Sequence, residues 1–94
     1  MKQLISLLIF ACFLLTACAP TELPEDGSSI SWAQAVDLLY RGDVTAVMQA
    51  HSLDVWLTLT NAATVKTVEP YIDAIFDEVQ RCGARCANIM LATE

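Results

Sequence analysis

The residues of this 94-residue sequence that could take part in chemistry are few: four cysteines and a single histidine. His51 has no second histidine with which to complete the tetrahedral ligand set that zinc requires. Ser52 is its immediate neighbour and is therefore badly placed as a nucleophile that His51 would activate. The sequence shows no glycine-rich phosphate loop and no carboxylate pair with a pocket to occupy. We therefore expect no catalytic residue, no metal and no cofactor, and predict that the protein is not an enzyme.

The first of the relevant cysteines, Cys18, follows a segment with the three parts of a secretory signal peptide. Met1 and Lys2 give a positive start, and residues 4–15 form an apolar run whose only polar side chain is Ser6. This run is shorter than the roughly 20 residues that a transmembrane helix needs. We predict a signal peptide over residues 1–17 that is removed after export.

The end of this segment, Leu15-Thr16-Ala17-Cys18, resembles the lipobox of bacterial lipoproteins. The resemblance implies that Cys18 receives a diacylglyceryl group, that cleavage occurs between Ala17 and Cys18, and that the new amino terminus can be acylated. Two or three chains anchor stably where one does not, because each buried methylene contributes about 0.8 kcal/mol. We expect a lipoprotein on the extracytoplasmic side of the cell envelope, whose partner in the membrane is lipid. Ala19 leaves both inner- and outer-membrane destinations open.

Cys82 and Cys86 are the cysteines that remain to the exported domain. An oxidising compartment favours their pairing, and positions i and i+4 at a helix end lie about 6 Å apart, within disulfide range. Gly83 gives the chain the freedom to close this ring. A redox pair and a metal-binding pair are the alternatives, although redox catalysis uses the C-x-x-C spacing rather than C-x-x-x-C.

The charge of the exported part excludes nucleic acid as a partner. Of the five basic residues one is Lys2, which leaves four against 11 acidic residues. A nucleic-acid-binding domain needs a basic patch to neutralise phosphate, and so does a domain that binds anionic lipid headgroups. We expect a protein partner in the membrane or envelope.

The elements that must position these residues begin after residue 29. Residues 18–29 are rich in proline and acidic side chains and are predicted to be a flexible spacer, which leaves a domain over residues 30–94. Ser31 and Gln34 form a capping box that starts a helix ending at Gly42. The helix has an apolar stripe at helical spacing, which consists of Trp32, Ala35, Val36, Leu39 and Tyr40. Asp37 and Arg41 are predicted to form an i, i+4 ion pair on its other face.

Strands are predicted from the periodicity that follows. Residues 44–50 are a first strand, the alternation over residues 53–60 predicts a second, and the β-branched residues 64–68 a third. Pro70 suits the first position of another helix, with an Asp77–Arg81 ion pair at i, i+4. The apolar stripe of this helix consists of Ile72, Ile75, Phe76 and Val79.

A short final strand over residues 89–91 completes the series. The order helix, three strands, helix is typical of an α+β domain with two layers, in which both helices cover one face of an antiparallel sheet.

Part of the domain resembles a known module. The start of the domain resembles the opening of the small extracytoplasmic domain of FtsH-type membrane-bound metalloproteases, on the residues Ile30-Ser31-Trp32, Gly42 and Val44-x-x-Val47. A second similarity is to the third strand of that module and the proline before its last helix, on the residues Thr67-Val68-Glu69-Pro70. The resemblance covers residues 30–82 and implies the same order of elements. Asn61-Ala62 in the second turn and the cysteine pair depart from that pattern. The ATPase and protease domains are not in this sequence, so no catalytic residue is carried over.

Three further residues are candidates for partner binding. Leu53, Val55, Leu57 and Leu59 share one face of the second strand, so Trp56 points away from the core and either anchors a partner or fills a cross-strand contact. Asp73 and Asp77 belong to an acidic helical face that is either simply solvated or docks a basic partner. We expect a non-catalytic, membrane-anchored interaction module; the alternative is a lipoprotein that handles a small ligand or metal with His51, Asp54 and the acidic face.

Overall fold

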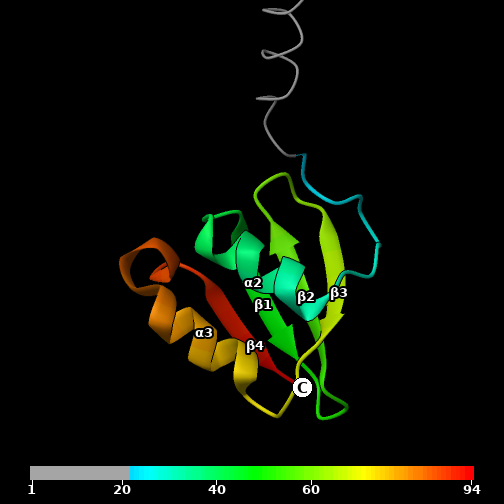
Figure 1. Cartoon of the computed structure of the whole chain (residues 1–94), viewed down its shortest axis with the longest axis vertical. Helices are drawn as coiled ribbons and strands as arrows, with labels where there is room; N and C mark the ends of the chain where they lie inside the picture. The colour runs from blue at the N-terminus through cyan, green and yellow to red at the C-terminus, as the bar shows by residue number, and fades with distance from the viewer. Residues whose placement is uncertain (1–21) are drawn as a thin grey trace, which may run out of the picture.

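The computed structural model describes residues 22–94, which form two helices packed on one face of a four-stranded sheet (Figure 1). Helix α2 spans Trp32–Tyr40, and strands β1, β2 and β3 span Val44–Gln49, Asp54–Leu59 and Thr64–Val68. Helix α3 spans Ala74–Cys82 and continues into a 3-10 turn, η1, over Gly83–Cys86. Strand β4, Met90–Thr93, is the last element. The predicted signal peptide and Cys18 lie outside the described residues.

The sheet has the order β3-β2-β1-β4. The pairs β1–β2 and β2–β3 are antiparallel, whereas β4 runs parallel to β1 with Leu91 opposite Val47. The two-layer α+β prediction is confirmed, and the short final strand exists. Its parallel direction makes the sheet mixed, because the chain crosses through α3 and η1 before it returns to the sheet.

The core lies between the helices and the sheet. Val55 and Leu57 are fully buried and Leu59 is nearly so, which is the alternation predicted for the second strand. Leu53 lies outside this alternation, because it has φ 73° in the turn before β2, where its N–H donates to the Ala50 carbonyl. The other large core side chains are Leu38, Leu39, Val44, Val47, Val65 and Ile75.

The first helix begins and ends as predicted. The Ser31 hydroxyl accepts from Gln34 N–H at 3.1 Å, and the Gln34 side chain accepts from Ser31 N–H at 2.9 Å. Gly42 follows the helix with φ +82°, a conformation that L residues with a Cβ rarely adopt. The buried stripe is centred on Ala35, Leu38 and Leu39, while Tyr40 is exposed.

The second helix begins later than predicted. Pro70 is not its first residue; it lies in a turn, and α3 starts at Ala74 behind Asp73, which has φ 71°. Ile72 is therefore outside the helix and exposed. The physical reason is Glu69, whose buried carboxylate accepts from Ile75 N–H and so fixes the helix start several residues further along.

The domain also begins earlier than predicted, so the spacer does not extend to residue 29. Gly27 N–H donates to the Thr64 carbonyl, Lys66 N–H donates to Ser28, and Ile30 N–H donates to Lys66. The Asp26 carboxylate accepts from Thr64 N–H at 2.7 Å. Residues 26–30 therefore occupy the outer edge of β3 at Thr64 and Lys66.

Candidate interaction surface

Trp56 lies at the centre of the sheet face that carries no helix. Its neighbours across the strands are Met48 on β1 and Lys66 on β3. The Lys66 ammonium is 6.0 Å from the centroid of the indole ring, a cation–π distance. The prediction that Trp56 points away from the core is confirmed, and its side chain is half-buried by these two cross-strand neighbours.

Apolar side chains extend from Trp56 across the same face. The strand register places Ala92 beside Met48, and alternation puts Val68 and Met90 on this side as well. Met48, Val68 and Met90 are 41%, 56% and 74% exposed. We define the open face by the residues Met48, Trp56, Lys66, Val68, Met90 and Ala92. Large apolar side chains exposed to solvent on the face of a sheet are typical of a protein-binding surface.

The polar groups at the rim of the open face are paired with one another. Lys66 forms an ion pair with Asp54 at 3.4 Å, and the same carboxylate accepts from the Ser52 hydroxyl at 2.9 Å. His51 is exposed in the preceding turn. Within residues 22–94 no three His, Cys, Asp or Glu side chains are grouped as they would be around a metal ion.

Asp73 is held by a residue of the core. Gln49 is 5% exposed, and its amide donates to the Asp73 carboxylate at 3.0 Å and accepts from Asp73 N–H at 3.0 Å. This pair of bonds satisfies the buried amide and connects the start of α3 to β1. The residue that the sequence singled out for partner binding therefore also has a structural role.

Asp77 lies one turn further along α3. It accepts from the Tyr71 hydroxyl at 3.4 Å, and Arg81 pairs with Glu78 at 3.1 Å. The predicted Asp77–Arg81 ion pair is wrong, because Glu78 lies closer to the Arg81 guanidinium at i, i+3. Asp73 and Asp77 are on the helix layer, so the structure does not bring them together with Trp56.

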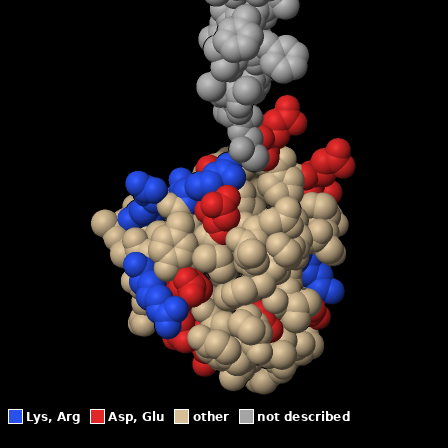
Figure 2. All heavy atoms as spheres, in the orientation of Figure 1, with Lys and Arg blue, Asp and Glu red and all other residues tan. Residues whose placement is uncertain are grey.

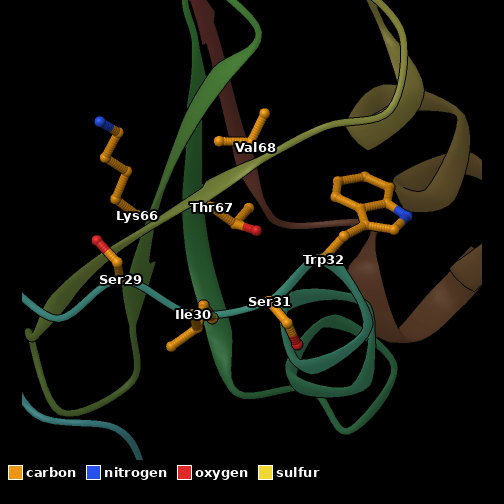
Figure 3. Close-up of a pocket in the computed structure, with 7 residues that line it drawn as sticks. All are labelled: Ser29, Ile30, Ser31, Trp32, Lys66, Thr67 and Val68. Carbon is orange, nitrogen blue, oxygen red and sulfur yellow. The ribbon is translucent and has the colours of Figure 1, made fainter.

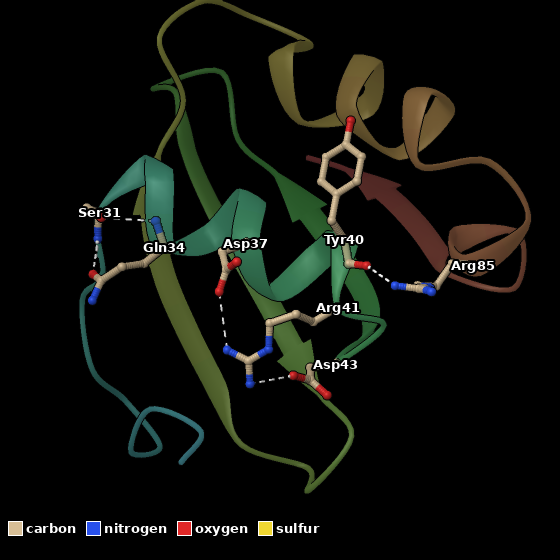
Figure 4. Close-up of polar contacts among 7 residues, drawn as sticks. All are labelled: Ser31, Gln34, Asp37, Tyr40, Arg41, Asp43 and Arg85. Atoms are coloured by element: carbon tan, nitrogen blue, oxygen red, sulfur yellow. Dashed lines mark hydrogen bonds and ion pairs between the residues drawn. The ribbon is translucent and has the colours of Figure 1, made fainter. Parts of the chain in front are cut away.

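A polar network that the sequence did not predict closes the end of α2 (Figure 4). Arg41 bridges Asp37 and Asp43 at 3.2 and 2.9 Å; the Asp37 pair alone was predicted from the i, i+4 spacing. Arg85 donates to the Tyr40 carbonyl at 2.8 Å. Residues 40 and 85 are too far apart in the chain for local spacing to reveal this bond.

Tyr40 forms a second connection to α3. Its hydroxyl donates to the Glu78 carboxylate at 2.8 Å. This hydrogen bond raises the pKa of Tyr40, because ionisation would remove the proton that the bond uses and place two negative charges side by side.

The cysteine pair is joined as predicted. Cys82 at the end of α3 and Cys86 at the end of η1 form a disulfide, with their Cα atoms 5.7 Å apart. The Cys86 sulfur lies 3.4 Å from the Leu39 carbonyl and is almost completely buried. The disulfide thus joins the end of α3 to η1, and its Cys86 sulfur packs against the last turn of α2.

Glu69 is a buried acid that neither composition nor spacing singled out. It is 1% exposed, and one carboxylate oxygen has no hydrogen-bond partner within the described chain. Burial raises the pKa of Glu69, while the N–H groups of Ile75 and Ala74 oppose this effect. Its place just before Pro70 looked like a helix start, so burial could not be deduced from spacing.

A hollow of about 240 Å³ lies between the start of α2 and β3. Trp32 forms one wall, and the Thr67 hydroxyl, which has no partner among the described residues, is turned toward it (Figure 3). Lys66 extends the opposite way, toward the open face. The remaining lining residues of the hollow are Ser29, Ile30, Ser31 and Val68.

No protein-family model matches this chain, and no curated protein is significantly similar to it in sequence. Among residues 22–94, no helix combines the length and hydrophobicity needed to cross a bilayer.

Proposed function

We propose that this protein is a small exported lipoprotein, anchored in the cell envelope through Cys18, whose domain binds a membrane or envelope protein through the open face without catalysing a reaction. The Leu15-Thr16-Ala17-Cys18 sequence and the apolar run before it support the anchor. The open face supports the binding role.

The observation that carries the binding role is the position of Trp56. An indole between Met48 and Lys66 is already restricted in its rotamers, so binding costs it little conformational entropy. A rigid aromatic side chain surrounded by exposed apolar groups is typical of a binding hot spot. A domain without a partner would gain no stability from leaving these apolar side chains exposed to solvent.

The length of the tether limits where the partner can be. Asp26 makes the first hydrogen bond to the domain and lies eight residues after Cys18. Fully extended, eight residues span at most about 28 Å. The domain of the lipoprotein would therefore stay close to the bilayer, and the partner would be a membrane protein or a protein held near the membrane.

We also propose that residues 30–82 share the architecture of the small extracytoplasmic domain of FtsH-type proteases. The order of α2, β1, β2, β3 and α3, with Gly42 after the first helix, supports this proposal. In that case residues 30–82 are a lipid-anchored relative of a module that in those proteases belongs to a membrane enzyme.

Site-specific photocrosslinking in cells of the source organism tests the binding role. A photoreactive amino acid at Val68 would lie on the open face, and one at Asp37 would lie on the exposed side of α2 as a matched control. The proposal predicts a discrete crosslinked protein from position 68 and none from position 37. Equal labelling from both positions, or none from either, would contradict the proposal. In a separate measurement, a small molecule that stays bound to the protein in native mass spectrometry would favour the ligand-handling alternative.

A further inference from the structure

The two edges of the sheet are treated differently by the chain. The β3 edge is covered by residues 26–30, whose N–H and carbonyl groups pair with Thr64 and Lys66. The opposite edge is β4, and all four of its residues are exposed. Met90 and Leu91 are 74% and 51% exposed, and the strand contains no charged residue and no proline. An apolar edge without charge or proline is what natural sheets normally avoid, because such an edge pairs with other strands.

The direction of the free backbone groups follows from one hydrogen bond. Glu94 N–H donates to the Gln49 carbonyl at 2.9 Å, which shows that residue 94 faces β1. Backbone groups alternate in direction along a strand, so those of Met90 and Ala92 also face β1, while those of Leu91 and Thr93 point outward. Within residues 22–94 no hydrogen bond from outside the sheet reaches the main chain of Leu91 or Thr93. Two donors and two acceptors are therefore free along this edge.

A groove runs beside these groups. A hollow of about 240 Å³ is lined by Phe76 of α3 together with Leu91, Ala92 and Thr93. Phe76 is only partly buried, and Figure 1 shows α3 passing alongside β4. A strand added to β4 would place alternate side chains against Phe76 and Leu91, and the others beside Met90 and Ala92 at the border of the open face.

Charge distinguishes between occupants of this groove. The Asp73 carboxylate accepts from the side chain of Gln49, which lies opposite Thr93, so this carboxylate lies near the Thr93 end of β4. Glu94 directly follows Thr93 and brings a second carboxylate to the same end of the strand. Asp77, one turn along α3 from Asp73, adds a third on the same helix face. Figure 2 shows acidic and basic side chains together on the side of the molecule where α3 lies, next to a broad uncharged area below them. On α3 itself, Arg81 is already paired with Glu78. A second copy would bring its own excess of acidic residues, whereas a segment with Lys or Arg would meet opposite charge.

We propose that β4 accepts an extended segment of another protein as a fifth strand, and that this segment has alternating apolar residues and a Lys or Arg at the end that meets Asp73 and Glu94. Main-chain hydrogen bonds to Leu91 and Thr93 supply affinity, and the contacts with Phe76 and the carboxylates select the sequence. The inference goes beyond the proposed function, since it needs neither the lipid anchor nor Trp56.

The test uses a displayed library of random linear peptides, selected against the disulfide-bonded domain. Enriched peptides should share the alternating apolar pattern with a basic residue. Thr93→Pro removes one outward N–H without touching the bonds between β4 and β1, and should weaken the selected peptides about tenfold. Thr93→Val keeps the N–H and is the matched control, which should bind like the parent protein.

Three outcomes would overturn the proposal. The first is a library that yields no common pattern, and the second is equal binding by Thr93→Pro and Thr93→Val when both are folded by circular dichroism. The third is sedimentation showing that the domain dimerises through β4, which would make a second copy the occupant. Trp56→Ala separates this inference from the proposed function, because it should leave peptide affinity unchanged even if it abolishes crosslinking from the open face.

Discussion

Gln49 and Asp73 are joined by two hydrogen bonds of 3.0 Å, one from the Gln49 amide to the Asp73 carboxylate and one from Asp73 N–H to the Gln49 amide oxygen. Gln49 is buried at the end of β1, and Asp73 stands in a left-handed conformation just before α3. The pair determines where the second helix begins and how it meets the sheet. Asp73 therefore differs from the rest of the acidic helical face, because it has a structural role in holding α3 against β1.

Replacing Asp73 should show this purpose directly. Asp73→Ala leaves the NH2 group of the buried Gln49 side chain without its acceptor, and places at φ 71° a residue that tolerates this conformation less well than Asp, so we expect a loss of about 2 kcal/mol in the free energy of unfolding. Asp73→Asn keeps an acceptor and tolerates this backbone conformation, and should cost less than about 1 kcal/mol. Urea denaturation of both variants is the measurement. Similar losses in the two would show that the pair with Gln49 does not matter.

Glu69 predicts a dependence of stability on pH. Its pKa is raised in the folded protein because the carboxylate is buried, so the folded state holds the proton more tightly than the unfolded chain does. Stability due to this group is therefore greatest below the ordinary glutamate pKa and is lost as the pH rises through the raised value.

The variant Glu69→Gln keeps the oxygen that accepts from Ile75 N–H but carries no charge. Relative to the parent protein, its melting temperature should improve as the pH increases from about 4 toward 7. Thermal unfolding across this range measures the difference between the two proteins. A difference that does not change with pH would show that Glu69 ionises without hindrance in the folded state.

The Cys82–Cys86 disulfide should stabilise the domain modestly. Closing a loop this short removes little entropy from the unfolded chain, which corresponds to about 2 kcal/mol of stabilisation. The double variant Cys82→Ala/Cys86→Ala should therefore fold but melt at a lower temperature than the oxidised parent. Addition of reductant to the parent should produce the same decrease, and should not affect the variant. Free thiols in protein purified from the cell envelope would contradict the structural role.

Cys18 tests the anchor. Cys18→Ser removes the sulfur that would receive the diacylglyceryl group, so the protein should accumulate unprocessed or lose its stable association with membranes. Fractionation of cells and the mass of the mature amino terminus measure both effects. Cys12→Ser lies within the predicted signal peptide and is the control that should be processed normally. A Cys18→Ser protein that is cleaved and retained like the parent would rule out the lipoprotein assignment.

Local features of the fold were predictable because they depend on neighbouring residues. The Ser31 capping box, the stop at Gly42 and the alternation that leaves Trp56 off the core all follow from spacing alone. The i, i+4 geometry likewise predicted the Cys82–Cys86 bond. In each case the interacting groups are within a few positions of one another.

Other features depend on contacts between distant residues, and the sequence misplaced them. Ile72 fits the helical period of α3 but lies in a turn, because Glu69 and Asp73 make their bonds to the start of the helix and to Gln49. Residues 26–29 resembled a spacer in composition, yet this segment pairs with β3. The parallel placement of β4 beside β1 has no local signal either.

The most direct measurement for the binding role is Trp56→Ala, examined for stability and for binding in the same preparation. The indole is half-buried on the face without helices, so its removal should cost about 1 kcal/mol by urea denaturation, compared with about 3–5 kcal/mol for a core aromatic residue. The folded variant should also lose the protein that is crosslinked from position 68 of the parent. A cost of several kcal/mol would place Trp56 in the core of the fold, and unchanged crosslinking with normal stability would show that the open face does not bind the partner.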